Sequence, residues 1–93
     1  MESLNNYQKT LIKSNIDDIK AIIDHDYSIG KLNRALSSLK DYLVILPNYK
    51  LYANAQIQDI MNFYRHEDKV FYQKYHRMNP KYIEVVLNLS NFK

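Results

Sequence analysis

Apolar residues recur three and four positions apart over two stretches in the first half of the chain, residues 3–24 and 28–46. This spacing places them on one face of an α-helix and predicts two amphipathic helices. The apolar positions are Leu4, Tyr7, Leu11, Ile12, Ile16, Ile19, Ile22 and Ile23 in the first stretch and Ile29, Leu32, Leu36, Leu39, Leu43 and Leu46 in the second. Because only residues 25–27 separate the two stretches, the sequence predicts an antiparallel helical hairpin.

The residues that flank these stretches predict where the helices begin and end. Ser3 and Ser28 are suited to N-caps, because a serine hydroxyl accepts a hydrogen bond from a free backbone N–H of the first turn. Pro47 is expected to end the second helix, since proline disfavours a helical residue before it and has no N–H to donate. Asn48 is then expected to cap a third helix.

A long third helix is predicted over residues 49–78, which contain neither glycine nor proline. Its apolar stripe consists of Ala53, Ile57, Ile60, Tyr64, Phe71, Tyr75 and Met78, and Tyr52, Phe63 and Val70 widen the stripe on one side. Glu67 interrupts the stripe. If the region instead forms two shorter helices, residues 65–68 are the expected break.

The C-terminal segment predicts a short fourth helix over residues 80–90, because Asn79 is a good cap and Pro80 suits the first helical position. Residues 83–89 alternate in polarity and would also fit a strand. No other segment offers a partner strand, which favours the helix. The predicted fold is all-α: a compact three- to four-helix bundle that forms a single domain over residues 1–93.

Composition narrows the setting in which the chain acts. The 93 residues include no cysteine, which excludes disulfides and thiolate chemistry and favours a reducing compartment. The N-terminus has no basic and apolar signal pattern, and the longest apolar run, residues 42–46, is far too short to span a membrane. We therefore expect a cytoplasmic protein.

The residue usage suggests the source of the chain and weakens the argument from its net charge. Ile, Lys and Asn occur ten times each and Tyr nine times, a bias typical of a low-GC bacterium, its phage or its plasmid. The same bias favours lysine, so the net charge of +3 is weaker evidence for an anionic partner than it looks. The excess of positive charge lies in the second half of the chain, residues 47–93.

Catalytic and cofactor chemistry finds little support. His25 lies in a turn, and His66 and His76 are about 15 Å apart along a helix, too far to share a metal ion. A single glycine excludes phosphate-binding loops, and no serine has a nucleophile motif. We expect no catalytic, cofactor-binding or metal-binding residue, and therefore a protein that is not an enzyme.

The stretch over residues 64–82 interleaves tyrosines with five basic side chains. On a helix Arg65, Lys69, Tyr72 and His76 lie away from the apolar stripe, and Arg77 follows them. Cations beside exposed aromatic rings suit an acidic protein surface or, as an alternative, a phosphate backbone contacted through residues 65–81. A solvated helix face is the simplest interpretation of the same residues.

The third helix is also longer than the hairpin that would cover it. The last helix, a second copy of the chain or another protein must cover the excess apolar surface around Tyr52, Phe63 and Val70. The expected function is a small non-enzymatic protein-binding module, an inhibitor, an immunity-type protein or a regulator. The alternatives are a DNA- or RNA-binding regulator and a self-assembling structural subunit. The comparison with bacteriocin-immunity proteins and phage inhibitors concerns size and helical architecture alone, since no motif identifies either family.

Overall fold

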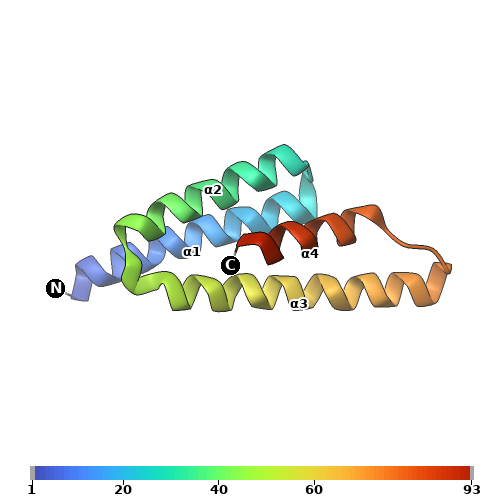
Figure 1. Cartoon of the computed structure of the whole chain (residues 1–93). Helices are drawn as coiled ribbons and strands as arrows, with labels where there is room; N and C mark the ends of the chain where they lie inside the picture. The colour runs from blue at the N-terminus through green and yellow to red at the C-terminus, as the bar shows by residue number, and fades with distance from the viewer. Residues whose placement is uncertain (1, 93) are drawn as a thin grey trace. The chain divides into compact units, whose positions relative to one another are not determined.

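The computed structural model describes the backbone of residues 2–92 and the side chains of residues 6–92. Over this range the chain forms four α-helices and no strand: α1 (Glu2–His25), α2 (Ile29–Ile45), α3 (Lys50–Tyr75) and α4 (Pro80–Phe92), with a 3-10 turn at Pro47–Tyr49 (Figure 1). This confirms the predicted all-α helical bundle in its four-helix form, with residues 83–89 in a helix. None of these helices combines the length and apolar character needed to cross a membrane.

The chain divides into two compact units, and the boundary falls within α3. The first unit extends to Gln56 and contains α1, α2 and the first turns of α3. The second begins at Ile57 and contains the rest of α3 and α4. The single domain over residues 1–93 stays a prediction.

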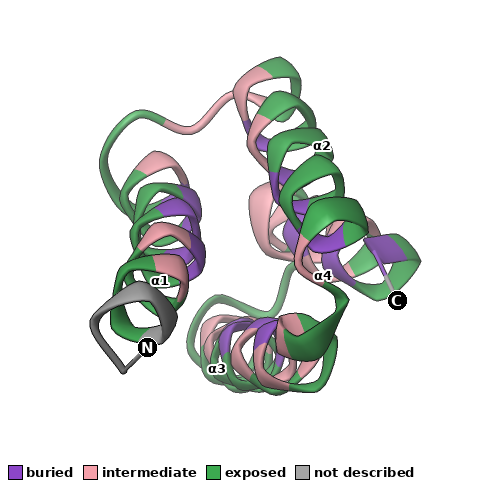
Figure 2. Ribbon diagram, turned by 90° about the vertical axis from the view of Figure 1, so that its left-hand side faces the viewer, coloured by how far each residue is buried: buried purple, intermediate pink, exposed green. Residues whose placement is uncertain are grey.

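In the first unit, α1 and α2 pack as the predicted antiparallel hairpin, and each buries one stripe of apolar residues (Figure 2). The buried residues are Ile12, Ile16, Ile19 and Ile23 on α1 and Leu32, Leu36, Leu39 and Leu43 on α2. Two residues of α1 differ from the pattern. Tyr7 was expected in the stripe but is 64% exposed, and Asn15 is only 8% exposed although it is polar.

The ends of the hairpin helices confirm one predicted cap and correct two. The Ser28 hydroxyl accepts a hydrogen bond from the Lys31 backbone N–H at 3.4 Å, as expected of an N-cap. Ser3 lies inside α1, because that helix already begins at Glu2, so the predicted cap is wrong. Asn48 does not cap α3 either, since the 3-10 turn after α2 contains it and α3 begins at Lys50.

Helix α3 continues through residues 65–68 without a break, and this excludes the two-helix alternative. The helix ends at Tyr75, three residues before the predicted end, because His76 adopts a left-handed backbone with φ 52°. The His76 N–H still donates to the Tyr72 carbonyl at 2.8 Å, a typical helix end. Met78 therefore lies in the connection to α4, where it is 62% exposed instead of buried in the stripe.

Helix α4 begins as the sequence predicts. The Asn79 side-chain oxygen accepts a hydrogen bond from the Lys81 backbone N–H at 3.0 Å, and Pro80 occupies the first helical position. The Asn79 carbonyl accepts further bonds from the N–H groups of the next turn. Val85, Leu89 and Phe92 form the buried side of this helix.

Candidate partner-binding surface at the turn between α3 and α4

A cluster of aromatic rings joins α3 to α4 within the second unit. The ring centre of Tyr82 in α4 lies 6.0 Å from that of Tyr64 and 6.1 Å from that of Phe71, both in α3. Phe71 and Tyr75 lie one helical turn apart, with ring centres separated by 4.6 Å. Such pairs stabilise by about 0.5–1.5 kcal/mol each beyond the area that they bury. The rings therefore connect the first turn of α4 with the second half of α3.

Two cationic side chains lie over rings of this cluster. The guanidinium carbon of Arg77 is 5.8 Å from the centre of the Phe71 ring, and the Lys74 ammonium is 5.4 Å from the centre of the Tyr75 ring. A cation over an aromatic face is attracted by the negative charge density of the ring. Arg77, Lys74 and Tyr75 are exposed, so the two charges and part of the Tyr75 ring are accessible to solvent. We call Phe71, Lys74, Tyr75 and Arg77 the cation–aromatic cluster.

Of this cluster, sequence reasoning predicted only Arg77 as a binding residue. Tyr75 was not predicted as a binding residue because the apolar spacing places it in a buried stripe, whereas it is 50% exposed. Lys74 belongs to the basic stretch but lies away from the helix face of Arg65 and Lys69. The spacing of four residues between Phe71 and Tyr75 brings their side chains together on a helix and could have indicated their contact. The contact of Lys74 with the adjacent Tyr75 has no such signal. The contact of Arg77 with Phe71 depends on the turn after Tyr75 and has no such signal.

The predicted polar face of α3 is present and exposed. Arg65, Lys69 and Tyr72 follow one another at spacings of four and three residues, and Tyr72 is 54% exposed. Lys69 and Tyr72 also line a small hollow of about 480 Å³ together with Asp68, Gln73 and Met78. Exposed His76 comes directly after the helix, so its left-handed backbone removes it from the helical spacing.

The predicted apolar flank does not join this face. Phe63 and Val70 are 55% and 42% exposed, but at about 100° per residue Phe63 and Arg65 point to nearly opposite sides of α3. Tyr52 belongs to the first unit, where it is half-buried and lies 5.2 Å under the Lys9 ammonium. The seven predicted binding residues of the second unit therefore do not form one continuous surface.

The described residues add no candidate for metal binding or acid–base catalysis. Among the residues that the structure describes, no group of three histidine or acidic side chains could hold a metal ion. His25, His66 and His76 are all exposed and widely separated in sequence.

Comparison with known proteins gives no further indication. No protein-family model matches the chain, and neither the curated proteins nor the solved structures contain a match. A proposal about function must therefore rest on the residues themselves.

Proposed function

We propose that this chain is a non-enzymatic protein-binding module that docks the turn between α3 and α4 onto an acidic surface of a partner protein. The observation that supports it is the cation–aromatic cluster, in which Arg77 and Lys74 lie over partly exposed rings at the end of α3. Aromatic residues, methionine and arginine are enriched where protein interfaces bury their core. Tyr72, Tyr75 and Met78 add exposed apolar area beside the two cations.

The positive charge of this region favours an acidic partner. Residues 64–82 carry five basic side chains and two acidic ones. Opposite charges on the two sides of an interface speed association and disfavour wrong partners. A cation that already lies over a ring before binding loses less rotamer entropy when a carboxylate pairs with it.

The arrangement of the cations favours protein over nucleic acid as the partner. A phosphate backbone is bound best by a row of cations along one side of an element. At about 100° per residue, Lys69 and Lys74 point about 140° apart around α3, and Arg65 lies close to Lys69. The positive charges therefore surround the end of the helix and do not form a single row.

The expected biological role and cellular compartment are those that the sequence predicts. The chain would act as an inhibitor, an immunity-type protein or a regulator in the cytoplasm of a low-GC bacterium, or for its phage or plasmid. A homodimer formed through the exposed Phe63 and Val70 side of α3 is compatible with docking at the turn, which uses other residues.

A comparative capture experiment tests this function. The wild-type protein, the Lys74→Glu/Arg77→Glu variant and a Lys13→Glu/Lys20→Glu control are each immobilised and exposed to a nuclease-treated lysate of the source organism. Lys13 and Lys20 are exposed on α1, so the control changes the net charge equally. We expect one acidic protein to be retained by the wild type and the control but lost from the cluster variant. Equal retention by all three baits would contradict the proposal. A parallel capture from an untreated lysate in which only nucleic acid is retained would contradict it as well.

A further inference from the structure

The most exposed apolar side chains of the described chain lie around the turn between α2 and α3, within the first unit (Figure 1). Val44 and Ile45 at the end of α2 are 80% and 75% exposed, and Leu51 in the first turn of α3 is 84% exposed. No other large apolar residue among those described is more than 64% exposed. We call Val44, Ile45 and Leu51 the aliphatic turn.

The packing of the hairpin does not use these side chains. Residues 42–46 form the longest apolar run of the sequence, but Leu43 alone in this run is buried in the seam. A helix that is apolar around its whole circumference is normally buried on all sides. The end of α2 therefore carries more apolar surface than the hairpin covers, and exposed apolar surface of this kind marks a site of interaction.

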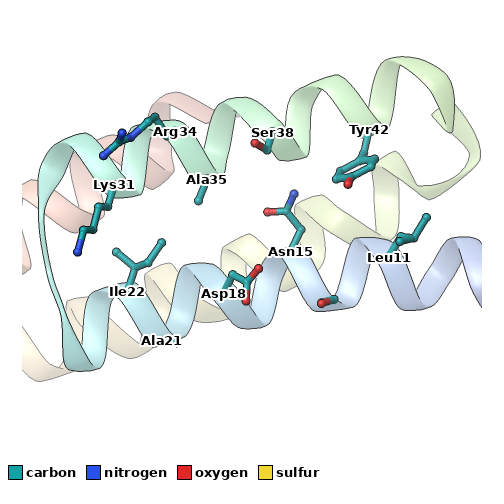
Figure 3. Close-up of a pocket in the computed structure, with 11 residues that line it drawn as sticks. Leu11, Asn15, Asp18, Ala21, Ile22, Lys31, Arg34, Ala35, Ser38 and Tyr42 are labelled. Carbon is teal, nitrogen blue, oxygen red and sulfur yellow. The ribbon is translucent and has the colours of Figure 1, made fainter.

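Tyrosine side chains flank the aliphatic turn. Tyr49 and Tyr52 are half-buried. Tyr42 is 37% exposed and lines one end of the groove between α1 and α2, where Figure 3 shows Tyr42 and Leu11 both pointing into the groove. Because a tyrosine ring is apolar and its hydroxyl is polar, tyrosine favours the boundary between lipid tails and water.

The charge beside the aliphatic turn is mainly positive. Exposed lysines come from all three helices at this end of the first unit: Lys9 on α1, Lys40 on α2 and Lys50 on α3. The Lys9 ammonium lies 5.2 Å from the centre of the Tyr52 ring, which places α1 beside the start of α3. Asp41 precedes the apolar run, but residues 42–58 contain no acidic residue. These surroundings attract an anionic partner.

We propose that the aliphatic turn inserts into the surface of a bilayer that contains anionic lipids. Its three side chains enter the boundary between headgroups and acyl chains, while the lysines keep their ammonium groups among the lipid phosphates. In this mode of binding the burial of apolar area and the attraction to anionic lipids act together. The aliphatic turn shares no residue with the cation–aromatic cluster, so this proposal does not depend on the proposed function.

The composition of the surface favours lipid over protein as the occupant. Protein interfaces are enriched in aromatic residues, methionine and arginine and depleted in lysine, and leucine and valine are under-represented among their hot spots. Aliphatic side chains beside lysines are instead typical of segments that lie in the membrane interface. A second copy of the chain is disfavoured, because a two-fold contact would bring the lysines of both copies together.

The test measures binding of the full chain to vesicles by co-sedimentation. Mixed vesicles contain phosphatidylglycerol and phosphatidylcholine in equal parts, and neutral vesicles contain phosphatidylcholine alone. We expect binding to the mixed vesicles to be at least tenfold stronger than to the neutral ones. Val44→Gln/Leu51→Gln should weaken it at least tenfold, since two inserted aliphatic side chains become polar. Val70→Gln/Leu87→Gln makes the same changes at exposed positions of the second unit and should leave binding unchanged.

A second pair of variants tests the charge. Lys9→Gln/Lys50→Gln should weaken binding to the mixed vesicles at least tenfold, because each lysine near the surface contributes to the attraction. Lys20→Gln/Lys69→Gln lowers the net charge equally at exposed positions away from the turn and should stay within about twofold of the wild type. Urea denaturation shows that each variant is folded.

The chain contains no tryptophan, so Leu51→Trp places a single fluorescent reporter in the aliphatic turn. Its emission should shift to shorter wavelength with the mixed vesicles, whereas the emission of Leu87→Trp should not. The proposal would be overturned if the mixed vesicles bind no better than the neutral ones, if Val44→Gln/Leu51→Gln binds as well as the wild type, or if the Leu51→Trp emission does not move. A dimer in analytical ultracentrifugation that Val44→Gln/Leu51→Gln dissociates would also overturn it, since a second copy would then cover the turn.

Discussion

The Arg77 guanidinium carbon lies 5.8 Å from the centre of the Phe71 ring, although α3 has already ended between these two residues. The left-handed backbone of His76 reverses the chain so that Arg77 returns over the last turns of the helix. One turn residue therefore places a charged side chain on a ring that also contacts Tyr75 and Tyr82. The surface proposed to bind a partner and the packing of α4 on α3 share this ring.

Phe71→Leu should lower the free energy of unfolding by about 2 kcal/mol, because it removes two ring pairs and one cation–ring contact. Urea denaturation of the variant measures this loss. Tyr7→Leu serves as the control, since Tyr7 is 64% exposed and its replacement should change stability by no more than about 0.5 kcal/mol. Equal stabilities of wild type and Phe71→Leu would show that the ring contacts do not hold α4.

Leu39→Ala should cost about 2–5 kcal/mol, because Leu39 is fully buried in the seam of α2 and its truncation leaves a cavity. Leu51→Ala makes the same chemical change on α3, where the side chain is 84% exposed, and should shift stability by about 0.5 kcal/mol or less. Comparison of the two urea midpoints shows whether the loss of stability comes from the burial of the leucine or from the Leu→Ala change as such. A Leu39→Ala midpoint equal to that of Leu51→Ala would contradict the hairpin packing.

The hairpin was predictable because its boundaries and its seams are local properties of the sequence. The spacing that contains Leu39 and the serine at position 28 predict a buried stripe and a cap without any knowledge of the rest of the chain. The burial of Asn15 was not predictable in this way. It depends on α2 lying across α1. Helical spacing alone predicts that a polar residue beside an apolar stripe is exposed.

The candidate surface at the turn was predictable only in part. The mixture of cations and tyrosines in residues 64–82 indicated the region, and Arg65, Lys69 and Tyr72 are exposed on α3 as expected. The cation–aromatic cluster depends on where α3 ends. A helix that continued to residue 78 would have placed Arg77 elsewhere, and no glycine or proline marks the stop at Tyr75.

His76→Gly should raise the free energy of unfolding by about 1 kcal/mol, because glycine adopts a positive φ without the steric cost that a side chain carries. Gln73→Gly, three residues earlier within α3, should instead lower it by about 1 kcal/mol, since glycine is unfavourable inside a helix. Thermal or urea unfolding measures whether each substitution raises or lowers the free energy of unfolding. A destabilised His76→Gly variant would mean that α3 does not end in a left-handed residue at this position.

The dissociation constant of the captured partner protein, measured by isothermal titration calorimetry, tests the central claim most directly. The comparison includes the wild type, the Lys74→Glu/Arg77→Glu variant and the Lys13→Glu/Lys20→Glu control, each shown by urea denaturation to be folded. The account predicts that reversing Lys74 and Arg77 weakens binding at least tenfold, a change of about 1.4 kcal/mol, while the control stays within about twofold of the wild type. Equal constants for all three proteins, or the same loss in the control, would contradict a docking surface at the cation–aromatic cluster.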